Sequence, residues 1–144
     1  MKLYRSYIGE ENILPLFRSK YPKPTGYYFA LSVKDAVRWR LTMDGYDIEF
    51  KVAEFEVPGH IEVIAARDGF YSEWPRSCKY FVGRLWEVVD YLKKNPLKIW
   101  FKDGEIIANP VALPEVILRE HQRDHIKLIN PDVPYKHLIK PITG

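Results

Sequence analysis

The sequence predicts an α+β fold, a single domain rich in strands with two clear helices. Its 144 residues fit one domain and are long enough to bury a core. Hydrophobic residues make up 47% of the chain and charged residues 28%, a globular composition. Strand-like runs outnumber helical ones, and no strand–helix–strand series with a glycine-rich phosphate loop is present, which argues against a Rossmann fold.

The first quarter of the chain predicts a strand, a short helical segment and a loop. Residues 2–8 (KLYRSYI) alternate enough to form a strand. Residues 9–19 are typical of one or two helical turns, with Pro15 limiting their regularity. Two prolines and a glycine make residues 20–26 a loop.

A strand followed by a capped helix comes next. The aromatic run at 27–31 (YYFAL) favours a strand. Residues 32–41 favour a helix, because Ser32 suits the N-cap position and Asp35 completes a capping-box pattern.

Two strands and a second helix occupy the middle of the chain. Residues 48–57 alternate with a slip at Ala53, which predicts a bulge or register change. Residues 60–66 form another strand. Residues 81–94 (FVGRLWEVVDYLKK) have one apolar stripe at helical spacing and predict a helix.

The last third predicts a hairpin, two strands and a tail. Residues 97–101 and 105–108 flank an Asp-Gly turn, the pattern of a hairpin. Residues 115–120 and 125–129 favour two strands joined by His-Gln-Arg-Asp. The tail at 130–144 has three prolines and is expected to wrap or fray.

Charge and cysteine content narrow the partners and the compartment. The net charge is +3, and Lys and Arg never form a run of five or six, so a nucleic-acid partner is possible but not indicated. The single cysteine, Cys78, excludes an internal disulfide and favours the cytoplasm. No stretch approaches the eighteen apolar residues of a membrane span, and no signal peptide is expected.

Three local patterns for metal or nucleophile chemistry are weaker than their structural alternatives. His121 and His125 have the spacing of metal ligands on a helix, but the flanking segments favour strands. Glu49 and Lys51 resemble half of a nuclease site that lacks its aspartate. Nothing in the sequence supplies a histidine partner for Cys78. We expect no metal, surface histidines and a structural thiol.

A further set of residues, spread along the chain, has the chemistry of a nucleotide site. Arg5 can neutralise phosphate, and a carboxylate such as Glu115 can accept a ribose hydroxyl and stabilise positive charge at an anomeric carbon. Taken singly, Arg5 could be a solvated strand residue and Ser32 only a helix cap. Glu105 and Glu120 are equally available as the carboxylate.

Taken in order, these segments resemble the ADP-ribosyltransferase fold family. The first motif is matched by Tyr4-Arg5-Ser6, the second by residues 28–32, and the third by Glu115-Val116-Ile117. The matched order spans residues 3 to 119. Leu113 stands where arginine-directed members carry a second carboxylate or a glutamine two residues before the catalytic glutamate.

The resemblance implies a mostly antiparallel split β-sheet with two to three helices and a toxin-like activity on NAD. It implies cleavage of the nicotinamide–ribose bond and transfer of ADP-ribose to an unidentified macromolecule or to water. By the resemblance, Arg5 holds phosphate or the nicotinamide end, Ser32 orients Glu115, and Glu115 grips the ribose and stabilises the transition state.

The resemblance also assigns tyrosines to the NAD site. Tyr4, Tyr27 and Tyr28 are the expected contacts, together with Arg5 and Ser32. Strand alternation lets only one of Tyr27 and Tyr28 face the cleft.

The alternative is a small non-enzymatic binding or inhibitor protein, viral or from a mobile element, that uses an aromatic surface to bind a host protein. Its expected anchors are the four tryptophans, Trp39, Trp74, Trp86 and Trp100. An inactive transferase-like fold is a third possibility. The enzyme hypothesis requires Arg5, Ser32 and Glu115 to converge on one cleft, whereas in a binding protein they scatter.

Overall fold

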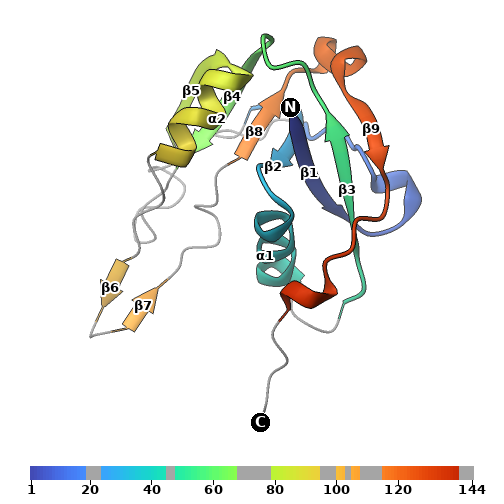
Figure 1. The fold of residues 1–144 in the computed structure, drawn as a ribbon, viewed down its shortest axis with the longest axis vertical. Coiled ribbons are helices and arrows are strands. Elements are labelled where there is room, and N and C mark those ends of the chain that lie inside the picture. Colours follow the sequence, from blue (N-terminus) through green and yellow to red (C-terminus); the bar gives the residue numbers. More distant parts are fainter. Residues whose placement is uncertain are drawn as a thin grey trace.

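The computed structural model describes residues 1–18, 24–44, 48–67, 79–94, 100–102, 105–107 and 115–139. Within these residues the fold is mixed α+β, with one seven-stranded antiparallel sheet in the order β5-β4-β8-β2-β1-β3-β9 (Figure 1). This confirms the predicted class and the antiparallel pairing, but the expected split sheet is instead one continuous sheet. None of the described helices is long and apolar enough to cross a membrane.

The sheet is built from segments distributed along the whole chain. Its strands are β1 (Lys2–Tyr7), β2 (Tyr27–Ala30), β3 (Lys51–Glu56), β4 (Glu62–Arg67), β5 (Lys79–Arg84), β8 (Glu115–Leu118) and β9 (Lys127–Asn130). A separate pair contains β6 (Trp100–Lys102) and β7 (Glu105–Ile107), which confirms the predicted hairpin. Among the described residues the helices are α1 (Val33–Asp44), α2 (Leu85–Lys94) and three short 3₁₀ segments, Glu10–Asn12, Glu120–His125 and Lys136–Leu138.

The two α-helices cover opposite faces of the sheet. The larger core contains residues such as Leu3, Phe29 and Val116 from one face, packed against the apolar side of α2. The smaller core lies on the other face, where α1 packs beside Val52 and Phe50. Burial of both sheet faces is consistent with the high apolar content of the central strands.

Helix α2 begins later than the sequence predicted. Residues 81–84 belong to β5 and pair with β4, so the helix starts at Leu85. Phe81 and Val82 are good strand formers, and Gly83 leaves room for Val88 of α2, whose Cγ2 would lie 3.1 Å from a Cβ at position 83. The predicted helical segment at 9–19 is also reduced to one 3₁₀ turn.

Two other predictions are confirmed and a third is corrected. The β3–β9 pairing changes register between Glu54 and Phe55, next to the slip predicted at Ala53. The described part of the tail wraps onto the smaller core, where the Tyr135 ring stacks 4.6 Å from that of Phe50. The predicted His-Gln-Arg-Asp turn is instead part of the 3₁₀ segment Glu120–His125.

The weakest junction of the sheet lies between β1 and β2. Strands β1 and β3 pair over six residues and β2 and β8 over four, whereas β1 and β2 pair only at Tyr4 and Ala30. The sheet is therefore continuous but consists of two well-paired parts joined at a narrow seam. We call this junction the β1–β2 seam.

Candidate functional site

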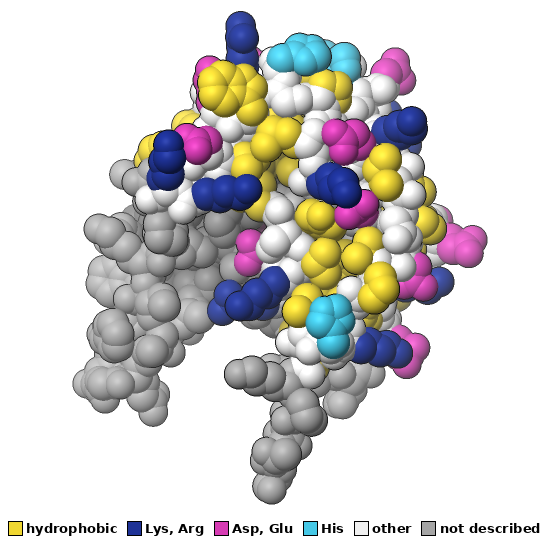
Figure 2. Space-filling view, in the orientation of Figure 1, with side chains coloured by type: hydrophobic (Ala, Val, Ile, Leu, Met, Phe, Trp, Pro, Cys, Tyr) yellow, Lys and Arg dark blue, Asp and Glu magenta, His cyan; other side chains and the backbone are white. Residues whose placement is uncertain are grey.

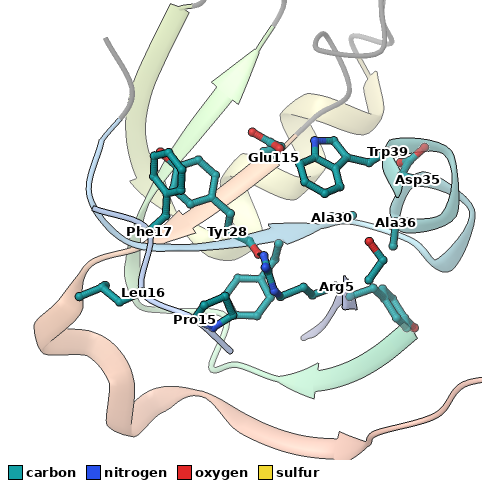
Figure 3. A pocket seen from close by; sticks show the side chains of 13 residues that line it. Arg5, Pro15, Leu16, Phe17, Tyr28, Ala30, Asp35, Ala36, Trp39 and Glu115 are labelled. Atoms are coloured by element: carbon teal, nitrogen blue, oxygen red, sulfur yellow. The ribbon is translucent and has the colours of Figure 1, made fainter. Parts of the chain in front are cut away.

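A cavity of about 320 Å³ lies at the β1–β2 seam (Figure 3). Its walls come from β1, residues 15–17, β2, the first turns of α1 and the start of β8. Most of the lining is apolar or aromatic, and its ionisable side chains include Arg5, Asp35 and Glu115. A mostly apolar cavity with a few convergent polar groups is the usual form of a small-molecule site, and this volume is at the lower end of the common range of roughly 300–1,000 Å³.

One wall is held in place by a close approach of backbones. Phe17 and Gly26 exchange two main-chain hydrogen bonds of 2.9 and 3.0 Å. A Cβ at Gly26 would lie 2.4 Å from the carbonyl oxygen of Leu118, so only glycine fits there. The Phe17 ring then meets the Tyr28 ring edge-on at 5.3 Å, which places both aromatics at the cavity.

Helix α1 forms a second wall. Its start is fixed by Ser32, whose Oγ accepts a hydrogen bond from the Asp35 N–H at 3.1 Å, which confirms the predicted cap. Asp35 and Trp39 are four residues apart and therefore lie on the same side of the helix, toward the cavity. Arg40 joins the helix to β1, donating from Nε to Ser6 Oγ (3.2 Å) and from Nη2 to the Ser6 carbonyl (3.0 Å).

Arg5 reaches the cavity through the seam. Strand alternation directs it to the face opposite Tyr4, but its Nη1 donates to the Tyr28 carbonyl at 3.4 Å. Its Nε is buried and has no hydrogen-bond acceptor in the part of the chain that the structure describes. Burial and the nearby Arg40 charge lower the pKa of Arg5 to about 10, against a smaller opposing effect of Glu115. The guanidinium is therefore held in an environment that disfavours its charge.

Glu115 is the first residue of β8 and is half-buried. It is paired with Ala30, which is itself opposite Tyr4, so these residues follow one line across the sheet beneath α1. In Figure 3 the Glu115 carboxylate lies between the Phe17–Tyr28 ring pair and the Trp39 indole. A carboxylate is thus presented at the cavity with aromatic rings on either side.

The structure brings four of the six predicted site residues together. The four that line the cavity are Tyr4, Arg5, Tyr28 and Glu115. Tyr27 does not line it: this side chain is buried in the larger core, with the Arg123 guanidinium 5.9 Å from the centroid of its ring. Only one of the two adjacent tyrosines faces the cavity, as strand alternation predicted.

Ser32 is placed at the cap of α1 and is not among the cavity-lining residues. Its contact with the cavity is indirect, since it fixes the start of the helix that carries Asp35 and Trp39. Sequence reasoning missed these two residues as site residues, although their spacing on a helix next to the aromatic strand was visible. Phe17 was also missed, because its segment was expected to be helical.

The tryptophans of the alternative hypothesis have different environments. Trp39 lines the cavity, and Trp86 on α2 is 51% exposed. Trp74 lies outside the described residues, as does Cys78, and the Trp100 side chain is likewise not described.

The remaining polar candidates whose side chains the structure describes lie on the surface; the Glu105 side chain lies outside them. His121 and His125 are exposed on the 3₁₀ segment Glu120–His125, and Glu120 is exposed beside them. Among the described residues, no three His, Cys, Asp or Glu side chains are grouped as metal ligands. On the face in Figure 2, basic and acidic side chains are interspersed, which matches the scattered charges of the sequence.

The cavity thus contains an arginine, two carboxylates and several aromatic rings. Comparisons with known proteins add no assignment to this geometry: no family model, no curated protein and no solved structure matches the chain.

Proposed function

We propose that the chain binds NAD in the seam cavity, cleaves the nicotinamide–ribose bond and transfers ADP-ribose to an acceptor molecule or to water. The observation that supports this most strongly is that Arg5 and Glu115, from opposite ends of the chain, line one cavity with Tyr4 and Tyr28. The resemblance to ADP-ribosyltransferases requires Arg5, Ser32 and Glu115 to converge; Arg5 and Glu115 do so, whereas Ser32 caps α1 and does not line the cavity.

The cavity residues fit one end of a dinucleotide. The volume of about 320 Å³ suits the nicotinamide end, with the remainder of the molecule outside. Tyr28 and Trp39 offer ring faces for the nicotinamide. Arg5 lines the cavity, and its guanidinium supplies N–H donors of the kind that bind a carboxamide or phosphate oxygen.

Glu115 provides the electrostatic part of the chemistry. Its carboxylate accepts a hydrogen bond from a ribose hydroxyl and stabilises the positive charge that develops at the anomeric carbon as the C–N bond breaks. The bonding electron pair leaves with nicotinamide, which becomes neutral. The acceptor then forms a bond to the anomeric carbon and releases a proton. Ser32 contributes through the α1 cap, which positions Trp39.

Release of free nicotinamide from NAD tests this proposal. Glu115→Gln keeps the shape of the side chain but removes its charge, and we expect a loss of roughly 100-fold or more in rate. Glu87→Gln is the matched control, because Glu87 is an exposed carboxylate on α2. Nicotinamide release at the same background rate in wild type and Glu115→Gln would contradict the proposal.

The alternative, an interaction surface for another protein, has one supporting observation. Trp86 of α2 and Val82 of β5 are 51% and 53% exposed. Under this alternative Trp86→Ala abolishes partner binding, whereas Glu115→Gln leaves it unchanged. Retained nicotinamide release in Trp86→Ala is expected under the transferase proposal.

A further inference from the structure

The arginine and the carboxylates that line the seam cavity come from different walls. Arg5 is on its β1 side, and the neighbouring Arg40 is turned toward Ser6. Glu115 and Asp35 are on the side of β8 and α1, so the lining contains two carboxylates and one guanidinium. In Figure 3 the strand that carries Tyr28 and Ala30 passes between Arg5 and the group formed by Glu115, Trp39 and Asp35. Both carboxylates thus come from the β8 and α1 side, here called the acidic end, where the Arg40 guanidinium also lies beside Trp39.

The acidic end also contains the aromatic rings. Figure 3 places Glu115 between the Tyr28 and Trp39 side chains, with Asp35 beyond Trp39. Aromatic faces attract cations through their quadrupole, and a nearby carboxylate strengthens this attraction in a site shielded from water. The Arg40 guanidinium carbon lies 5.1 Å from the centroid of the Trp39 ring, so this ring already takes part in one cation–π contact and a ligand would use its remaining surface.

We infer that the space between Tyr28 and Trp39 is a binding site for a planar organic cation whose charge lies next to Glu115. A flat, delocalised cation can place its face on an aromatic ring and its edge at the carboxylate, whereas a neutral molecule of the same shape gains only the stacking. The site should therefore select for charge and not for shape alone.

Two kinds of ligand carry a planar cation that could occupy this site. One is the pyridinium ring of oxidised nicotinamide dinucleotide, an identification that rests on the proposed function. The other is a guanidinium group of a peptide or small molecule. The cation site itself does not depend on bond cleavage.

Binding of matched pairs of small probes tests the inference. In each pair one molecule is cationic and the other is its neutral counterpart: 1-methylnicotinamide against nicotinamide, and methylguanidinium against urea. Binding is measured by titration calorimetry at low ionic strength. We expect at least one cation to bind roughly tenfold more tightly than its neutral counterpart. Preference for 1-methylnicotinamide identifies the pyridinium source, and preference for methylguanidinium identifies the guanidinium source.

Three variants locate the site. Glu115→Gln should reduce the affinity for the cation to that for its neutral counterpart, and Trp39→Leu should weaken both. Trp86→Leu is the matched control, since Trp86 is exposed on α2, and it should change neither. Thermal unfolding of each variant confirms that it is folded. Equal affinity for cation and neutral molecule in both pairs, or an unchanged cation preference in Glu115→Gln, would overturn the inference.

The same experiments separate this inference from the proposed function. A cation preference that depends on Glu115, in a protein that releases no nicotinamide from NAD, supports the cation site and rejects the transferase. Nicotinamide release without any preference for charge rejects the cation site and supports the transferase.

Discussion

Replacing Arg5 by methionine should stabilise the protein while removing a ligand contact. Methionine has a similar unbranched stem but no charge. Burial and the nearby Arg40 charge lower the pKa of Arg5 to about 10, net of a smaller opposing effect of Glu115. Since a tenfold change in a proton equilibrium corresponds to about 1.4 kcal/mol, the buried charge disfavours the folded state by roughly 3 kcal/mol.

One favourable contact of Arg5 reduces the expected gain. The substitution loses a long hydrogen bond of 3.4 Å to the Tyr28 carbonyl, whereas the attraction of Glu115 is already included in the pKa of about 10. This loss is on the order of 1–2 kcal/mol, so we expect a net gain of about 1–2 kcal/mol in the free energy of unfolding.

Urea unfolding at pH 7 measures this gain. The midpoint should rise in Arg5→Met with no change in the m-value. Under the proposed function, the affinity for NAD should fall in the same variant. A loss of more than about 1 kcal/mol in the free energy of unfolding would refute the reasoning, because it would show that Arg5 is needed by the fold.

Three further substitutions test the packing and the hydrogen bonds around the sheet. Gly26→Ala would place a Cβ 2.4 Å from the β8 main chain and should lower the free energy of unfolding by about 1–3 kcal/mol in urea unfolding. In the control Gly59→Ala, the added Cβ meets only side-chain atoms at 3.4 Å or more, so this substitution should be tolerated. Gln122→Ala removes the 2.6 Å hydrogen bond from the Gln122 side chain to the β4 main chain and should lower the free energy of unfolding by about 1–3 kcal/mol. The exposed His121→Ala should lower it by less than about 0.5 kcal/mol, and equal effects of the two substitutions would contradict a stabilising role for this bond. Burial and nearby carboxylates raise the pKa of Tyr7 above 10, so the unfolded chain loses this proton first and stability falls as pH rises above about 10. In Tyr7→Phe the free energy of unfolding should depend less on pH between 9 and 11, and an unchanged dependence would refute this.

Local patterns were sufficient to predict the β2–α1 unit. The aromatic run and Ser32 specify a strand and a capped helix, and strand alternation alone shows that Tyr27 and Tyr28 point to opposite faces. These features depend on neighbouring residues, which is why they could be read from one sequence.

Features that depend on distant pairing could not be predicted. Residues 81–84 continue the apolar spacing of α2, and only their pairing with β4 makes them a strand. Trp39 was expected as an exposed anchor, because the sequence does not show which side of α1 faces the seam. Strand alternation alone places Arg5 and Glu115 on opposite faces of the sheet. They nevertheless line one cavity, because β1 and β2 pair at a single position and leave the seam open.

The most direct test of the proposed function is the time course of free nicotinamide and ADP-ribose from NAD with wild type and Glu115→Gln in parallel. Nicotinamide should appear with wild type, and its rate of release should fall roughly 100-fold or more in the variant, while both proteins unfold at similar temperatures. Indistinguishable time courses from two folded proteins would contradict the central claim that Glu115 acts on a nicotinamide dinucleotide in the seam cavity.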